Sequence, residues 1–226
     1  MLDQVKGGLI VSCQALEHEP LHSSFIMGRM ARAAEEGGAV GIRANTKADI
    51  DEIAKNTALP IIGIVKRDYE GTPIYITPTL REIEELAQTS CAMIAFDATE
   101  RPRYQGEALA DFLQKARAAA PGKLMMADIA TLSEAVNAEK LGFDCVSTTL
   151  MGYTEQSAGD NIADDDFAKL KAILAAVHIP VIAEGHVDTP AKARRCLELG
   201  AHAVVTGGAI TRPQQITKAF TDAIYA

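Results

Sequence analysis

The sequence contains no tryptophan, and only 5% of its residues are aromatic. It also lacks any apolar run near the roughly 18 residues of a membrane-spanning helix. Its start, MLDQVKGGLIVSCQALEHEP, has no secretory cleavage pattern. Thirty Asp and Glu against 22 Lys and Arg give a formal charge of -8, which disfavours nucleic acid and anionic lipid as partners. We therefore expect a cytoplasmic protein with no membrane or nucleic-acid partner.

Cysteine and histidine are few and scattered. No CxxC pair or Cys/His cluster with zinc spacing occurs among the four cysteines, and the five histidines form no HExxH pattern. Isolated cysteines in apolar runs are usually buried as free thiols. We expect no metal site and four reduced thiols: Cys13, Cys91, Cys145 and Cys196.

The chain instead alternates short apolar runs with amphipathic segments. Eight strand-like runs lie at 7–14, 39–44, 60–66, 91–97, 123–129, 145–149, 180–185 and 203–208. Helix-start signals precede the segments between them: Thr46 before Asp49, Thr79 with Glu82, Thr131 with Glu134, and Thr189 with Pro190.

Strands that are apolar on both faces and alternate with helices indicate a parallel sheet covered by helices. An open doubly wound sheet usually has fewer strands and a glycine-rich turn after the first strand, where this chain has Ser-Cys-Gln. Eight units in 226 residues predict an α/β fold of the (β/α)8 TIM barrel type, as one domain spanning 1–226. The longer loop at 67–78 is expected to cover the barrel mouth.

Polar residues end most of the predicted strands. In such barrels the carboxyl ends of the strands form the active site. The two-residue period of a strand puts Lys66 on the side of Ile62 and Ile64, and Glu184 on the side of Ile182. Any one such residue could simply begin an exposed loop, but several at equivalent places favour a shared cup. The candidates are Gln14, Arg43, Lys66, Asp128 and Glu184, while Asp97, Thr148 and Thr149 stay unassigned.

A second signal follows the last two strands. Gly185 comes after the seventh, and the segment TGGAITRP after the eighth contains Gly207, Gly208 and Arg212. Glycines let backbone N–H groups approach an anion, and an arginine fork suits phosphate. Loops at this place are the recurrent phosphate site of the fold, so a phosphorylated small metabolite is the expected ligand.

Seven segments together resemble the N-acetylmannosamine-6-phosphate 2-epimerase family of bacterial sialic acid catabolism: GGLIVSCQ, AVGIRA, PIIGIVKRD, FDATERPR, STTLMGYT, VIAEG and GGAITRP. The resemblance implies interconversion of N-acetylmannosamine 6-phosphate and N-acetylglucosamine 6-phosphate, without metal or nucleotide cofactor. It implies catalytic roles for Lys66 and Glu184. The implied substrate contacts are Gln14, Arg43, Asp128 and Tyr153, and the implied phosphate site is Gly185, Gly207, Gly208 and Arg212. It assigns nothing to Tyr104 or His186.

The chemistry narrows the roles. The proton on the carbon bearing the acylamino group is acidic only when C1 is a carbonyl, so the sugar ring must open before a base acts. We expect Lys66 to be that base and Glu184 to assist ring opening or proton delivery. Arg43 is expected to hold the substrate and stabilise it electrostatically, and Asp128 to orient sugar hydroxyls or Lys66 itself.

Other functions remain open at this point. A strand-end lysine could form a Schiff base in an aldolase. A different sugar-phosphate isomerase would use the same phosphate site, and a sensor would bind sugar phosphate without turnover. The C-terminal TKAFTDAIYA suggests a homodimer through exposed apolar residues, although a barrel helix packed on its own strand would explain them equally well.

Overall fold

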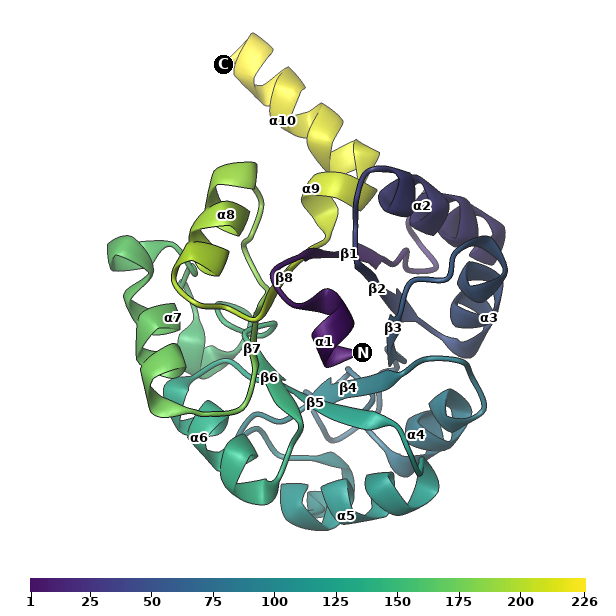
Figure 1. The fold of residues 1–226 in the computed structure, drawn as a ribbon, viewed down its shortest axis with the longest axis vertical. Coiled ribbons are helices and arrows are strands. Elements are labelled where there is room, and N and C mark those ends of the chain that lie inside the picture. The colour runs from purple at the N-terminus through teal and green to yellow at the C-terminus, as the bar shows by residue number, and fades with distance from the viewer.

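The computed structural model describes residues 1–226 and contains eight parallel strands that close into a barrel (Figure 1). The strands pair in chain order, and β1 closes the barrel by pairing with β8, Leu9 beside Val204. The predicted barrel is therefore confirmed, and each strand falls within or beside its predicted run. The strands are β1 (Leu9–Cys13), β2 (Gly41–Asn45), β3 (Ile61–Ile64), β4 (Met93–Asp97), β5 (Leu124–Asp128), β6 (Cys145–Ser147), β7 (Val181–Ala183) and β8 (Ala203–Thr206).

Helices follow the strands and surround the barrel (Figure 1). The helix start predicted at Thr131 is confirmed by hydrogen bonds that cap the helix. The Thr131 hydroxyl accepts from the Glu134 N–H at 3.3 Å, and the Glu134 carboxylate accepts from the Thr131 N–H at 2.9 Å. None of the helices is both long and apolar enough to cross a membrane. The longer helices are α2 (Ser24–Glu36), α3 (Lys47–Asn56), α4 (Leu80–Ala87), α5 (Leu109–Ala119), α6 (Leu132–Leu141), α7 (Asp164–Ala176), α8 (Pro190–Glu198) and α10 (Pro213–Tyr225). The short ones are α1 (Leu2–Val5), η1 (Tyr104–Gly106), η2 (Glu155–Ser157) and α9 (Gly208–Thr211).

The apolar core has two parts, one inside the barrel and one between the barrel and its helices. Ile62, Ile64 and Ile182 belong to the inner cluster, so the predicted inward side of β3 and β7 is confirmed. Val5 of α1 joins this cluster, and α1 closes the amino-terminal end of the barrel, which the sequence reading did not predict. The carboxyl-terminal end of the barrel is not closed in this way, and a cavity opens there. All four cysteines are free and buried, as expected.

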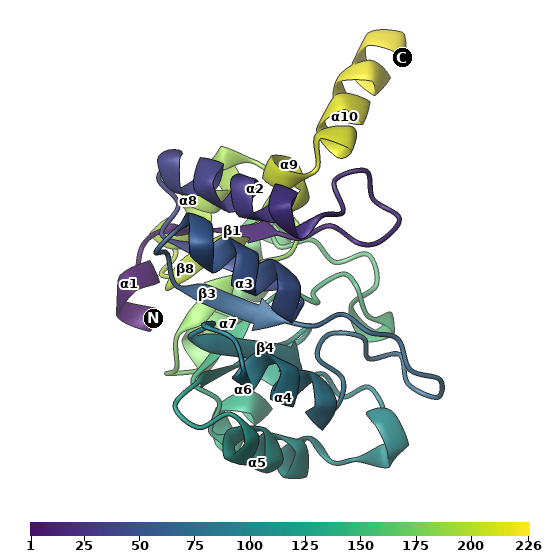
Figure 2. The same cartoon turned by 90° about the vertical axis from the view of Figure 1, so that its right-hand side faces the viewer.

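The C-terminal helix departs from the barrel pattern. The other long helices lie against the sheet, whereas α10 projects away from the barrel (Figure 2) and contains no buried residue. Phe220 is 67% exposed and Ile224 is 69% exposed. The alternative explanation of its apolar residues, a barrel helix packed on its own strand, is therefore wrong.

Phe96 on β4 belongs to the part of the core that lies between the barrel and its helices. Its ring is fully buried and meets Phe112 of α5 and Phe143, each at 5.0 Å between centroids. We expect Phe96→Ala to lower the free energy of unfolding by about 3–5 kcal/mol, because it leaves a cavity between sheet and helices. Urea unfolding followed by circular dichroism measures it. The control is Phe25→Ala, at a side chain 64% exposed on α2, where a change above about 0.5 kcal/mol is not expected.

Candidate active site

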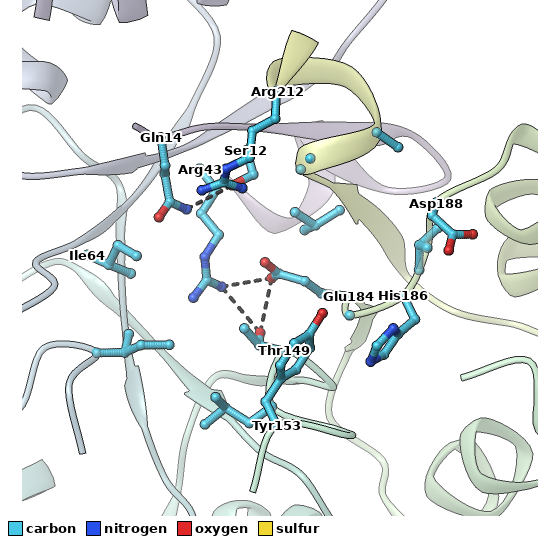
Figure 3. Close-up of a pocket in the computed structure, with 18 of the residues that line it drawn as sticks. Ser12, Gln14, Arg43, Ile64, Thr149, Tyr153, Glu184, His186, Asp188 and Arg212 are labelled. Carbon is cyan, nitrogen blue, oxygen red and sulfur yellow. Dashed lines mark hydrogen bonds and ion pairs between the residues drawn. The ribbon is translucent and has the colours of Figure 1, made fainter. Parts of the chain in front are cut away.

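A cavity of about 360 Å³ opens at the carboxyl ends of the strands (Figure 3). Parallel strands carry their last side chains to one rim, so residues far apart in the sequence meet there. Tyr75 and Ile76 also line it, so the end of the loop at 67–78 forms part of the cavity wall. Nine of the ten predicted site residues line the cavity: Gln14, Arg43, Lys66, Tyr153, Glu184, Gly185, Gly207, Gly208 and Arg212.

Arg43 on β2 is the centre of the site. Its side chain is 1% exposed, and its Nη2 lies 2.5 Å from Asp128 Oδ2. Its Nη1 donates to Asp128 Oδ1 at 3.1 Å and to Glu184 Oε2 at 2.9 Å. Burial opposes the charged guanidinium, but the two carboxylates outweigh it and raise the pKa of Arg43. One permanent cation therefore holds two carboxylates from different strands.

Asp128, at the end of β5, is the tenth predicted residue and does not line the cavity. It is fully buried, and both of its oxygens accept hydrogen bonds from Arg43. Asp128 therefore holds the Arg43 guanidinium in place from the side away from the cavity. Asp97, to which the sequence assigned no role, is also buried. Its carboxylate binds the loop that follows β4 and accepts a hydrogen bond from the Thr99 hydroxyl at 2.7 Å.

Glu184 is held by its backbone as well as by its carboxylate. Its N–H donates to Thr148 Oγ1 at 3.0 Å, and that hydroxyl donates to the Glu184 carbonyl at 2.7 Å. The next residue, Gly185, has a φ of +82°, and a Cβ there would lie 3.0 Å from the Thr148 carbonyl oxygen, so glycine is required. Burial raises the pKa of Glu184; Asp128 adds to this and Arg43 opposes it.

Lys66 follows β3 and reaches the cavity from the opposite wall. Its N–H donates to Asn45 Oδ1 at 2.8 Å, and its backbone pairs with Ile76 of the loop at 67–78. Burial, then the charges of Arg43 and Arg212, lower the pKa of Lys66 to about 8, against the attraction of Glu184. The lowered pKa increases the fraction of Lys66 that is the neutral amine, the form that can accept a proton.

The other end of the cavity offers donors to an anion. No hydrogen bond in the structure engages the backbone N–H groups of Gly185, Gly208 or Ala209. Arg212 lies beside them and is paired with Glu19: its Nε is 2.5 Å from Oε1, and its Nη2 is 3.1 Å from Oε2. Glu19 does not line the cavity, so this pair fixes Arg212 from outside. Sequence reasoning missed Glu19, which sits in a loop without any motif.

Two further side chains complete the walls. Gln14 donates through Nε2 to Ser12 Oγ at 2.8 Å, while its Oε1 is buried without a partner. Tyr153 stacks on His186, with ring centroids 4.8 Å apart and planes 5° from parallel (Figure 3). His186 was assigned nothing from the sequence; only its place after Gly185 could have drawn attention to it.

The chemistry of this donor set is proton transfer. No group of three or more His, Cys, Asp or Glu side chains is arranged to hold a metal ion. A partly neutral amine, a carboxyl group with a raised pKa and a buried guanidinium instead face one cavity, with anion donors at its far end.

Comparison with known proteins places the chain among close relatives. The family model described as "Putative N-acetylmannosamine-6-phosphate epimerase" matches residues 27–226. Two relatives carry the name "Putative N-acetylmannosamine-6-phosphate 2-epimerase". The one from Enterobacter sp. (strain 638) is 58% identical over 100% of this chain and 96% of its own, and the one from Clostridium perfringens (strain SM101) is 59% identical over 98% and 99%.

Solved structures give the same result. A structure described as the N-acetylmannosamine-6-phosphate 2-epimerase from Clostridium perfringens superposes with a TM-score of 0.93 at 58% identity, covering 99% of this chain and 96% of that chain. Thiamine phosphate pyrophosphorylase from Pyrococcus furiosus matches with a TM-score of 0.63 at 17% identity, over 96% and 93% of the two chains, which is a likeness of fold alone.

The lowered pKa of Lys66 can be tested by the pH dependence of its acylation. Only the neutral amine is acylated, so we expect the labelling rate of wild-type Lys66 by acetic anhydride to rise with pH through a midpoint near 8. In Arg212→Gln the midpoint should move to higher pH, because a cation that lowers the pKa is lost and Glu19 is left uncompensated. Mass spectrometry of pulse-labelled protein measures both. The labelling profile of exposed Lys218 should be the same in both proteins; an unmoved or lower Lys66 midpoint contradicts the prediction.

Proposed function

The chain belongs to the N-acetylmannosamine-6-phosphate epimerase family, and from this we propose that it interconverts N-acetylmannosamine 6-phosphate and N-acetylglucosamine 6-phosphate at the barrel mouth. The observation that carries the proposal is the pairing of a low-pKa lysine with a mostly buried carboxyl group across one cavity. Inverting a carbon next to a carbonyl requires a group that accepts a proton and a site that returns one.

The reaction starts from the open-chain sugar. We assign to Glu184 the proton exchange that opens the ring, because burial favours its neutral form and so lets it carry a proton. Opening gives an aldehyde at C1, which makes the C2 proton acidic.

Lys66 then takes the C2 proton as a neutral amine and becomes an ammonium. The electron pair left at C2 moves into the C1–C2 bond, and the negative charge passes to the C1 oxygen. Arg43 and the new ammonium supply positive charge beside that oxygen. Either the Lys66 ammonium or the protonated carboxyl group of Glu184 then returns a proton to the other face of C2, and ring closure gives the epimer.

The opposite end of the cavity suits the phosphate group. The free N–H groups of Gly185, Gly208 and Ala209 can donate to its oxygens, and Arg212 adds a guanidinium held in place by Glu19. Gln14 is proposed to meet the sugar, since its buried Oε1 still lacks a donor and an amide N–H or a hydroxyl would provide one. Tyr153 would lie along the sugar from its stack on His186.

Family membership favours this reaction over the Schiff-base aldolase, another sugar-phosphate isomerase and the non-catalytic sensor. We propose the cytoplasm as its location, because a reducing compartment suits four free thiols. The proposed partner is this small molecule, and a charge of -8 gives no reason to add nucleic acid.

We also propose a homodimer built through α10. This helix presents Phe220 and Ile224, one turn apart on the same face, to solvent at 67% and 69% exposed, without any contact that would bury them. Burying such a stripe against a second copy is the ordinary use of an unpartnered apolar face in a metabolic enzyme.

Proton NMR in D₂O tests the reaction. With N-acetylmannosamine 6-phosphate and no added metal or nucleotide, we expect the gluco epimer to appear with deuterium at C2. Lys66→Ala should lower kcat at least ~10²-fold, the lower end for losing a general base. Lys47→Ala, at an exposed lysine outside the cavity, is the matched control and should turn over normally.

Three results would count against this assignment. Near-normal turnover by Lys66→Ala would remove Lys66 as the base. An unchanged substrate spectrum despite binding would favour the sensor, and a substrate adduct trapped on Lys66 by borohydride would favour the aldolase.

Light scattering after size-exclusion chromatography tests the dimer. We expect wild type at about twice the 24.1 kDa chain mass, and Phe220→Asp at the mass of one chain, because a charge in the apolar stripe opposes burial. Lys218→Asp lies about 200° around the helix from Phe220 and should remain dimeric. A monomeric wild type, or dissociation by both variants alike, would argue against α10 as the interface.

A further inference from the structure

Thr149 occupies a position between the two carboxylates that the proposed mechanism does not use. It follows β6, and its Oγ1 lies 2.7 Å from Asp128 Oδ1 and 3.0 Å from Glu184 Oε2. Ser147 Oγ lies 2.8 Å from Thr149 Oγ1 and 3.2 Å from Glu184 Oε2. One hydroxyl therefore bridges the permanent Arg43–Asp128 pair and the carboxyl group of Glu184.

A hydroxyl has a single proton and cannot donate to three acceptors at once. When Glu184 is ionised, the Thr149 hydroxyl can donate to Oε2. When Glu184 is protonated, its own O–H can donate to Thr149 Oγ1, and the Thr149 hydroxyl is then free to donate to Asp128 Oδ1. Both arrangements use the same atoms at the same distances, so the change needs only rotation about the C–O bond.

We propose that Thr149 is a positioning residue whose hydroxyl turns between Asp128 and Glu184 as Glu184 loses and regains its proton. Its catalytic consequence rests on the proposed role of Glu184 in ring opening, but the hydrogen-bond exchange itself does not. Without the hydroxyl, the ionised form of Glu184 loses a hydrogen-bond donor held at 3.0 Å by the fold.

Several charged or titratable groups face Glu184, and the direction of the effect follows from them. Arg43 from β2 and Lys66 after β3 favour the ionised carboxylate, whereas Asp128 from β5 opposes it and Tyr153 after β6 lies nearby. Burial raises the pKa of Glu184, and the hydrogen bonds from Thr149 and Ser147 lower it. Removing the Thr149 hydroxyl leaves Arg43, Lys66 and Asp128 in place, so the Glu184 pKa should rise.

Carbon NMR of the full-length protein, labelled with ¹³C at the glutamate carboxyl groups, measures this directly. The Glu184 signal is identified by its absence from Glu184→Gln, and its titration midpoint is compared among four proteins. Thr149→Val removes the hydroxyl with little change of shape, and Thr149→Ser restores it. Thr206→Val makes the same change at another strand end, outside the cavity and without a hydrogen bond to Glu184.

We expect Thr149→Val to raise the Glu184 midpoint by about one pH unit, the size of a lost hydrogen bond to a charged group. Thr149→Ser should stay within about 0.3 units of wild type, and Thr206→Val should not move it. Thr149→Ala replaces the valine variant if that protein does not fold, with the same expected shift.

An unmoved midpoint in Thr149→Val, or an equal shift in Thr206→Val, would overturn the inference. The titration needs no substrate, so failure of the epimerase proposal would appear separately, as absent turnover by wild type in D₂O.

Discussion

A single buried guanidinium holds the site together. Arg43 is 1% exposed and binds Asp128 from β5 and Glu184 after β7, so one cation joins three strands of the barrel. Removing charges from water is expensive unless each is paired, and removing one partner of a buried pair leaves the other uncompensated. The closed barrel meets this demand because it brings the ends of distant strands to a single rim, where two carboxylates can share one arginine.

Burial moves the pKa values of the two titratable neighbours of this cation in opposite directions, whereas the cation itself lowers both. Arg43 adds to the burial that lowers the pKa of Lys66 to about 8, and it only partly offsets the burial that raises the pKa of Glu184. The amine is thereby moved toward its neutral form and the carboxyl group toward its protonated form. Two groups whose pKa values approach each other can exchange protons with a substrate at one pH, which is the arrangement that acid–base catalysis needs.

The sequence predicted the barrel and the rim because both depend on local periodicity. Apolar runs marked every strand, and the period of two gave the inward side of Lys66 and Glu184. Asp128 shows the limit: its place at a strand end was readable, but burial beneath Arg43 depends on contacts between strands. Glu19 acts through a partner 193 residues away, so no spacing could have marked it. Thr149 was readable as a strand-end residue, but its role depends on Asp128, 21 residues away on another strand. The course of α10 away from the barrel was unreadable because its apolar stripe fits either kind of packing.

The anion end of the cavity explains how a chain with a charge of -8 can receive a phosphorylated sugar. The net charge acts over the whole surface and is screened beyond about 10 Å at ordinary ionic strength. Inside the cavity the relevant groups are the fixed N–H dipoles of Gly185, Gly208 and Ala209, which no counter-ion neutralises, and Arg212, whose position Glu19 fixes from behind. Arg212 also disfavours the ammonium form of Lys66. With the proposed site assignments, a bound phosphate dianion would weaken that influence and favour proton uptake by Lys66, and phosphate binding would be coupled to proton transfer through one arginine.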